Sequence, residues 1–120
     1  MSEELSVSTG LRFVKGEREL EKSYAGVMLD VSGSNYFQGN QTILTSATVV
    51  NIGAVASIGY ILAKNLDSTN YVSFHNGSGG ALTVELPPKG SALFKLATSG
   101  TLYATANTAT VEIEYTVISA

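Results

Sequence analysis

Short runs in which apolar and polar residues alternate recur along most of the chain, and the clearest pair lies within residues 57–75. Residues 65–70 separate the two runs and are rich in side chains that hydrogen-bond their own backbone in turns. The pattern therefore predicts a strand, a polar turn and a second strand. The alternating apolar positions are Ile58, Tyr60, Leu62, Val72 and Phe74.

Later segments repeat this style of short strand and polar turn. The glycine-rich residues 76–80 indicate a turn. Residues 87–90 indicate a second turn, because the backbone of proline cannot donate a hydrogen bond to a sheet. The last run has the cleanest alternation, so we expect it to lie centrally in a sheet. Residues 36–40 are expected to form a loop. The remaining predicted core positions are Leu82, Val84, Phe94, Leu102, Val111, Ile113, Tyr115 and Val117.

These runs predict one all-β domain. The chain of 120 residues suits a single core. About eight strands separated by regular turn signals are typical of an antiparallel sandwich or a small barrel. No segment carries a convincing helical period, apart from the ambiguous charged stretch at residues 15–22.

The N-terminal part has a different character from the rest. Residues 15–22, KGERELEK, are the most charged stretch and are compatible with a helical turn or a solvated strand. We interpret them as an exposed arm or an edge strand, since edges tolerate charge. The expected organisation is an arm over residues 1–23 and a sandwich over residues 24–120.

Composition excludes several classes of site. The chain has no Cys and a single His, which rules out cysteine- and histidine-based zinc patterns. Basic residues do not cluster, so we expect no nucleic-acid partner. No window is as apolar as a membrane-spanning helix, and the acidic N-terminal residues do not resemble a secretory signal. We therefore expect no membrane partner.

Four groups of residues are candidates for chemistry. His75 is interpreted as a surface residue at a strand end, not a catalytic base. Residues 77–80 are interpreted as a hairpin loop, because a phosphate cradle needs a helix after it. Asp67 with Asn65 and Asn70 offers too few carboxylates for Ca²⁺ and is interpreted as turn capping. Glu112 and Glu114 are interpreted as a solvated strand face. We expect no catalytic residue, cofactor, metal or small-molecule substrate.

Four aromatic residues remain as candidates for binding. Tyr71 and Tyr103 fall on the outer register of their strands, and Tyr36 and Phe37 lie in the expected loop. Aromatic residues in polar surroundings are favoured at protein interfaces and sugar-binding platforms. The alternative is that two packed sheets bury both faces of these strands. A carbohydrate-binding module is therefore an alternative function.

Three stretches carry a resemblance to known proteins. GYILAKNLDSTNYVSF, LPPKGSALFKL and LYATANTATVEIEYTV resemble small β-sandwich virion proteins of tailed bacteriophages, over residues 59–117. Those proteins combine a K-N-L-D-x-T-N-x-V hairpin, an L-x-P-G-x-x turn and a closing A-x-x-x-x-x-V-x-V-x-Y strand. This chain departs from the pattern by an additional Pro88-Lys89 before Gly90.

The resemblance implies a non-enzymatic structural protein of a phage particle with a jelly-roll-like sandwich. Its expected role is a capsid decoration, or cement, protein on the virion surface that binds the major capsid protein; a tail or neck component is the alternative. The arm would contact a neighbouring subunit or the capsid. The few charges after residue 30 predict a homo-oligomer, a trimer by preference. The expected partner-binding residues are Leu11, Arg12, Phe13, Lys15, Arg18, Tyr36, Phe37, Tyr71 and Tyr103.

Overall fold

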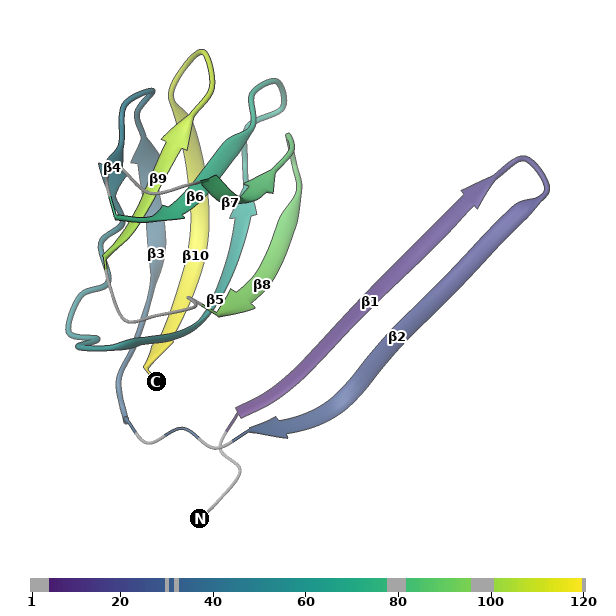
Figure 1. Cartoon of the computed structure of the whole chain (residues 1–120), viewed down its shortest axis with the longest axis horizontal. Coiled ribbons are helices and arrows are strands. Elements are labelled where there is room, and N and C mark those ends of the chain that lie inside the picture. The colour runs from purple at the N-terminus through teal and green to yellow at the C-terminus, as the bar shows by residue number, and fades with distance from the viewer. Residues whose placement is uncertain (1–4, 30, 32, 78–81, 96–100, 120) are drawn as a thin grey trace. The chain divides into compact units, whose positions relative to one another are not determined.

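The chain consists of two compact units, Met1–Ser32 and Gly33–Ala120. The computed structural model describes residues 5–29, 31, 33–77, 82–95 and 101–119 (Figure 1). The regular structure of these residues is entirely strand, as predicted. The boundary between the units lies later than the one expected after residue 23, because the segment that begins at Tyr24 pairs within the N-terminal unit.

The N-terminal unit is a single β-hairpin. Strand β1 (Leu5–Lys15) pairs antiparallel with β2 (Arg18–Leu29), and no further strand among the described residues joins this sheet. Gly16 has φ of 60° and is the first central residue of the two-residue turn, the position at which a type II′ turn requires glycine. Residues 15–22 are therefore strand ends and a turn, which excludes the helical alternative.

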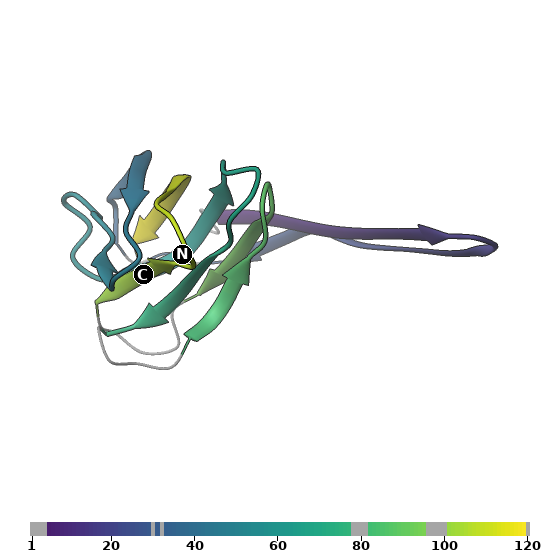
Figure 2. The ribbon, with the colours of Figure 1, turned by 90° about the horizontal axis from the view of Figure 1, so that it is seen from above.

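The second unit is an antiparallel sandwich of two four-stranded sheets, as Figures 1 and 2 show. The first sheet has the order β3-β10-β5-β8 and the second has the order β4-β9-β6-β7. The first comprises β3 (Tyr36–Ile43), β10 (Val111–Ser119), β5 (Ile58–Asn65) and β8 (Ser91–Lys95). The second comprises β4 (Thr48–Val49), β9 (Leu102–Ala106), β6 (Val72–Asn76) and β7 (Leu82–Leu86).

Strand β10 is central, as its alternation predicted. It pairs with β3 on one side and with β5 on the other. Its four predicted core residues, Val111, Ile113, Tyr115 and Val117, are all buried. The loop expected at residues 36–40 is wrong: these residues are the first part of β3, and Gly39 pairs with Tyr115.

The predicted register of β5 is wrong beyond its first residue. Ile58 pairs with Ser119 but Ile61 pairs with Val117, so β5 has one more residue than β10 between these pairs. This bulge reverses the face to which the following side chains point. Leu62 is consequently 53% exposed, whereas the residues on either side of it are buried.

The other predicted core positions follow the expected pattern where they are described. Val72, Phe74 and Leu102 are buried. Val84 and Phe94 are half-buried and pack against the core, and the rings of Phe74 and Phe94 lie 5.5 Å apart. Tyr60 is only half-buried, and it lies within the bulge of β5, between Ile58 and Ile61. The side chain of Leu82 lies outside the described part of the structure.

A buried amide joins the β5–β6 turn to the β7–β8 turn. Asn65 has no exposed surface. Its Oδ1 accepts a hydrogen bond from the Asp67 amide at 2.8 Å, and its Nδ2 faces the carbonyl oxygens of Asn70, Leu86 and Pro87 at 2.9, 3.2 and 3.2 Å. The backbone N–H of Asn65 donates to the Gly90 carbonyl at 2.8 Å. These bonds fix both turns against each other.

We predict that Ile113→Ala lowers the free energy of unfolding by about 2–5 kcal/mol, because it leaves a cavity in the middle of the core. Chemical denaturation monitored by circular dichroism measures this change. The neighbouring Glu112→Ala, on the exposed face of β10, is the control and should cost less than about 1 kcal/mol. Equal losses in the two variants would contradict the observed register of β10.

We predict that Asn65→Ala destabilises the sandwich by at least about 2 kcal/mol, since it leaves a buried amide and several carbonyls without their partner. The matched control is Asn40→Ala on the exposed face of β3. Denaturation midpoints of both variants test the prediction. A loss in Asn65→Ala no larger than in Asn40→Ala would show that water replaces the buried side chain without cost.

Candidate functional site: a hairpin with one apolar face

The register of the hairpin sorts its side chains onto two different faces. Residues directly opposite in an antiparallel pair project to the same side, and successive residues alternate. Phe13 lies opposite Leu20, and Leu11 lies opposite Lys22, so these four share one face. We call it the apolar face. It comprises Leu5, Val7, Thr9, Leu11, Phe13 and Lys15 from β1, and Arg18, Leu20, Lys22, Tyr24, Val27 and Leu29 from β2.

A bulge near Gly26 keeps the apolar residues of β2 together. Thr9 lies opposite Tyr24 whereas Val7 lies opposite Val27, so β2 has one additional residue between these pairs. Gly26 has φ of 72°, a conformation that glycine adopts without strain. Without the bulge, Val27 would project to the opposite side from Tyr24. The insertion therefore extends the apolar face to the base of the ribbon.

The large apolar residues of the hairpin are exposed to solvent. The exposed fractions are 63% for Leu11, 49% for Phe13 and 53% for Leu20, and Tyr24 is also exposed. An isolated two-stranded hairpin is only marginally stable in water and needs a third layer against its apolar face. The described residues of this unit provide no such layer. The face therefore has the composition of a surface that a partner covers.

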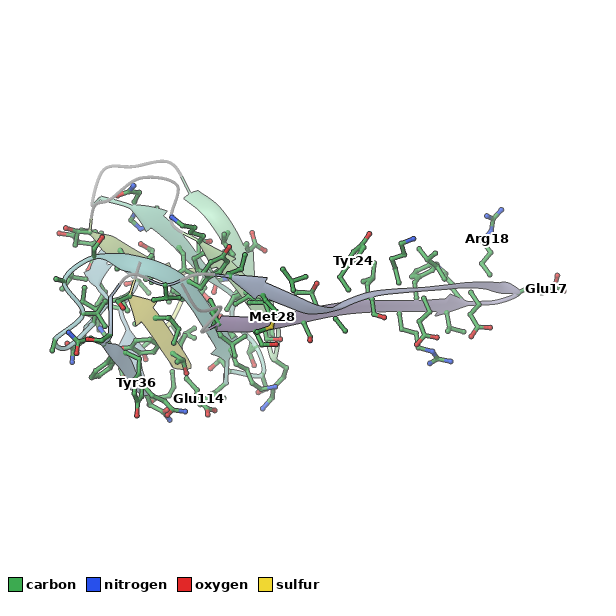
Figure 3. The ribbon with its side chains drawn as sticks, turned by 90° about the horizontal axis from the view of Figure 1, so that it is seen from below. Glu17, Arg18, Tyr24, Met28, Tyr36 and Glu114 are labelled. Atoms are coloured by element: carbon green, nitrogen blue, oxygen red, sulfur yellow. The ribbon has the colours of Figure 1, made fainter. Side chains whose placement is uncertain are left out.

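Charge is divided between the two faces as well. Lys15, Arg18 and Lys22 all lie on the apolar face, toward the turn. Glu19 and Glu21 lie on the opposite face with Arg12, whose Nη2 is 3.4 Å from Glu19 Oε2. Figure 3 shows Arg18 and Tyr24 projecting from the same side of the ribbon. The apolar face therefore carries basic residues and no carboxylate among the described strand residues.

The sandwich has a second exposed surface, the outer face of the β3-β10-β5-β8 sheet. Tyr36 is 67% exposed there, and the β5 bulge places Leu62 on the same face. A shallow pocket on this face is lined by Gln38, Leu62, Lys64, Ser91, Glu114 and Thr116. Tyr36 and Glu114 lie on the same side of the sandwich in Figure 3.

The predicted partner-binding residues are divided between these surfaces and the core. Leu11, Phe13, Lys15 and Arg18 lie together on the apolar face, and Arg12 lies on the opposite face. Phe37 does not lie in an exposed loop: it packs against the core, and its ring is 5.8 Å from that of Tyr115.

The four aromatic candidates do not form one platform. Tyr36 and Phe37 are neighbours in β3 and point to opposite faces. Tyr71 immediately precedes β6 and is 38% exposed, and Tyr103 is half-buried in β9. Only Tyr36 presents most of its surface to solvent.

His75 is buried, which contradicts its predicted surface position. Its exposed fraction is 3%, and its ring stacks on Tyr103 with centroids 6.0 Å apart. Nδ1 lies 2.8 Å from the Gly77 carbonyl oxygen and therefore carries a hydrogen, since a carbonyl only accepts. Nε2 lies 3.0 Å from Thr105 Oγ1, so in the neutral ring it accepts from this hydroxyl. Nε2 thus links β6 to β9, and Nδ1 links the ring to the residue that directly follows β6.

Asp67 caps the β5–β6 turn, as predicted. The amides of Asn70 and Thr69 donate to its Oδ2 at 2.6 and 2.9 Å and lower the pKa of the Asp67 carboxyl below its ordinary value of 3.8. Glu112 and Glu114 are exposed, as expected, and Thr42 Oγ1 donates to Glu112 Oε1 at 2.9 Å. No group of acidic or histidine side chains within the described residues could hold a metal ion. Residues 78–80 of the expected glycine loop lie outside the described residues.

Sequence reasoning named four of the twelve residues of the apolar face as partner-binding residues and missed the other eight. Tyr24, Val27 and Leu29 were assigned to the sandwich because they continue an apolar run. The available signal was Gly26, since a lone glycine within a strand pattern often marks a bulge. The sequence shows Lys22 only as part of a charged stretch, because alternation alone does not reveal that Leu11 of β1 lies opposite it.

We predict that acid destabilises the protein partly through Asp67. Because its folded-state pKa is lowered, this carboxylate contributes stability above its unfolded pKa that is lost as the pH falls through the folded pKa. Denaturation midpoints measured from about pH 5 to about pH 2 should fall less steeply in Asp67→Asn than in the original protein. Glu114→Gln, which removes an exposed charge on β10, is the control. Identical acid profiles for all three proteins would contradict the prediction.

Within the described residues, no helix is long and apolar enough to cross a membrane. Comparisons with models of protein families, with curated proteins and with solved structures found no match for this chain.

Proposed function

We propose that this chain is a non-enzymatic structural protein of a phage particle, most specifically a capsid decoration protein that stabilises the head by binding between capsid subunits. The observation that carries the proposal is the exposed apolar face of the hairpin. A ribbon with eight apolar side chains and three basic ones on one side is built to lie against another protein surface. The sandwich then serves as the body that the ribbon anchors.

The topology of the sandwich supports this proposal. Two facing sheets with the orders β3-β10-β5-β8 and β4-β9-β6-β7 have the strand arrangement expected of an eight-stranded jelly roll. This is the fold that the resemblance to small phage virion proteins implies. The residues of that resemblance also have clear structural roles: Asn65 and Asp67 hold the first turn, and Gly90 closes the second by donating to the Pro87 carbonyl at 2.8 Å.

The dimensions of the hairpin suit an anchoring arm. Strand β1 has 11 residues, and a ribbon of that length spans about 36 Å. A ribbon of this length is long enough to contact two subunits of a lattice. Its turn holds only Gly16 and Glu17, so the strands remain paired to the tip. A decoration protein that binds through this arm also has a body free to contact a second subunit.

We predict that Phe13→Thr combined with Leu20→Thr weakens binding to phage particles that lack the protein by about a hundredfold or more, because two large side chains lose their apolar burial. Threonine preserves the tendency to form strands, so the ribbon is maintained. Co-sedimentation with particles measures the binding. Mass spectrometry of separated heads and tails should find the chain with the heads.

The matched control is Val14→Thr combined with Met28→Thr. These residues are 53% and 45% exposed but lie on the opposite face of the ribbon. The control should bind particles as the original protein does. Equal losses for both double variants would argue against the apolar face as the anchor. Absence of the chain from purified particles would refute a virion role, and its presence only in tails would favour a tail or neck component.

A further inference from the structure

The outer face of the sandwich contains a strip that matches the apolar face of the hairpin. On strands β3 and β10, Tyr36 lies opposite Ile118 at one end, and Thr42 lies opposite Glu112 at the other. Glu114 lies opposite Asn40, next to the acidic end. We call this surface, made by the outward residues of β3 and β10, the acceptor strip. It is two strands wide, as is the ribbon.

The charges of the two surfaces are opposite. The residues of the acceptor strip include Glu112 and Glu114 and no basic residue, and Lys64 of the neighbouring strand β5 lies opposite Glu114 at the border of the strip. The apolar face of the hairpin carries Lys15, Arg18 and Lys22 and no carboxylate. Each surface also changes along its length from apolar to charged. The acceptor strip and the apolar face therefore match in two respects: their charges are opposite, and in both the apolar residues lie at one end and the charged residues at the other.

The geometry points to an exchange of arms between copies of this chain: the apolar face of one copy covers the acceptor strip of the next. The basic residues near the turn then lie over Glu112 and Glu114. The apolar residues behind them lie over Tyr36 and Ile118. Leu62, exposed by the β5 bulge, borders the strip beside Thr116 and extends its apolar part.

The area of such a contact favours a closed set of copies. A ribbon about 36 Å long and about 10 Å wide buries roughly 700 Å² when both surfaces are counted. One contact of this size is below the range of roughly 1,200–2,000 Å² that is typical of stable complexes. In a closed ring every copy uses its arm once and its strip once, which doubles the buried area per copy. Both surfaces belong to the same chain, so they are present in equal number.

This inference rests on the proposed function and refines it: the apolar face is covered by the acceptor strip of another copy, so that the linked copies, not a single free arm, bind the capsid subunits. Its test is separate from the particle experiment, since it uses the purified full-length protein alone. Arm exchange without particle binding would support the inference and count against the virion role. Particle binding by a protein that stays monomeric in solution would support the virion role and count against the inference.

Charge reversal in two variants tests the exchange. The arm variant carries Lys15→Glu, Arg18→Glu and Lys22→Glu, and the strip variant carries Glu112→Lys and Glu114→Lys. Each variant alone should be mainly monomeric by light scattering at tens of micromolar, whereas the original protein associates. An equimolar mixture of the two should associate again, because acidic arms then meet basic strips and the unchanged arms meet unchanged strips. Restoration in the mixture requires contact between different copies.

Matched reversals on other surfaces are the controls. Glu19→Lys with Glu21→Lys changes the opposite face of the ribbon, and Glu85→Lys changes an exposed position on β7 in the second sheet. Both should associate as the original protein does, and circular dichroism should show strand content in all variants. A monomeric original protein, association that survives in both reversed variants, or a mixture that stays monomeric would each overturn the inference.

Discussion

The sandwich depends on one buried amide. Asn65 ends β5 in the first sheet, and its side chain bonds to the carbonyls of Asn70, which precedes β6, and of Leu86, the last residue of β7, both strands of the second sheet. Burying an amide without hydrogen-bond partners costs free energy. The burial of this side chain is therefore favourable only when both turns are formed and supply its partners. Leucine would fill the volume but leave the Asp67 amide without an acceptor. The two layers are thus held in one register by polar contacts at their edge as well as by the apolar core.

The part of the fold that the sequence predicted well is the part where one face of a strand is fully buried. Val111 to Val117 in β10 alternate without exception, and a sheet that buries one face imposes that alternation on any central strand. The turn at Asp67 was also predictable, because carboxylates and amides that follow a strand cap backbone groups locally. Both signals are short-range, so neither requires knowledge of which strands pair.

The errors about which face a residue of β5 or β2 occupies share one physical cause, which is an inserted residue in the strand. A single additional residue reverses the direction of every side chain beyond it. In β5 this moved Leu62 to the outer face, and in β2 it kept Val27 on the same face as Tyr24. His75 is a different case, because the additional residue near it lies in β7 and His75 keeps its place in the register with β9. Alternation within one strand does not reveal a bulge, and a lone glycine such as Gly26 is the signal that the sequence offers. For this reason the sequence did not predict which residues share the apolar face or the acceptor strip, although it contains all of them.

The central position of β10 has a consequence for the order of folding. Strands β3 and β5 are each incomplete until Val111–Ser119 has been synthesised, because β10 lies between them. Ile43 pairs with Val111, and at about 5–20 residues per second a ribosome needs roughly 3–14 seconds to reach the later residue. The hairpin requires no such delay, since its pairs are close in sequence and form in about 1–10 microseconds. Each nascent chain therefore has a finished ribbon while its sandwich is still open, and its unpaired strands are then most open to association with the wrong partner.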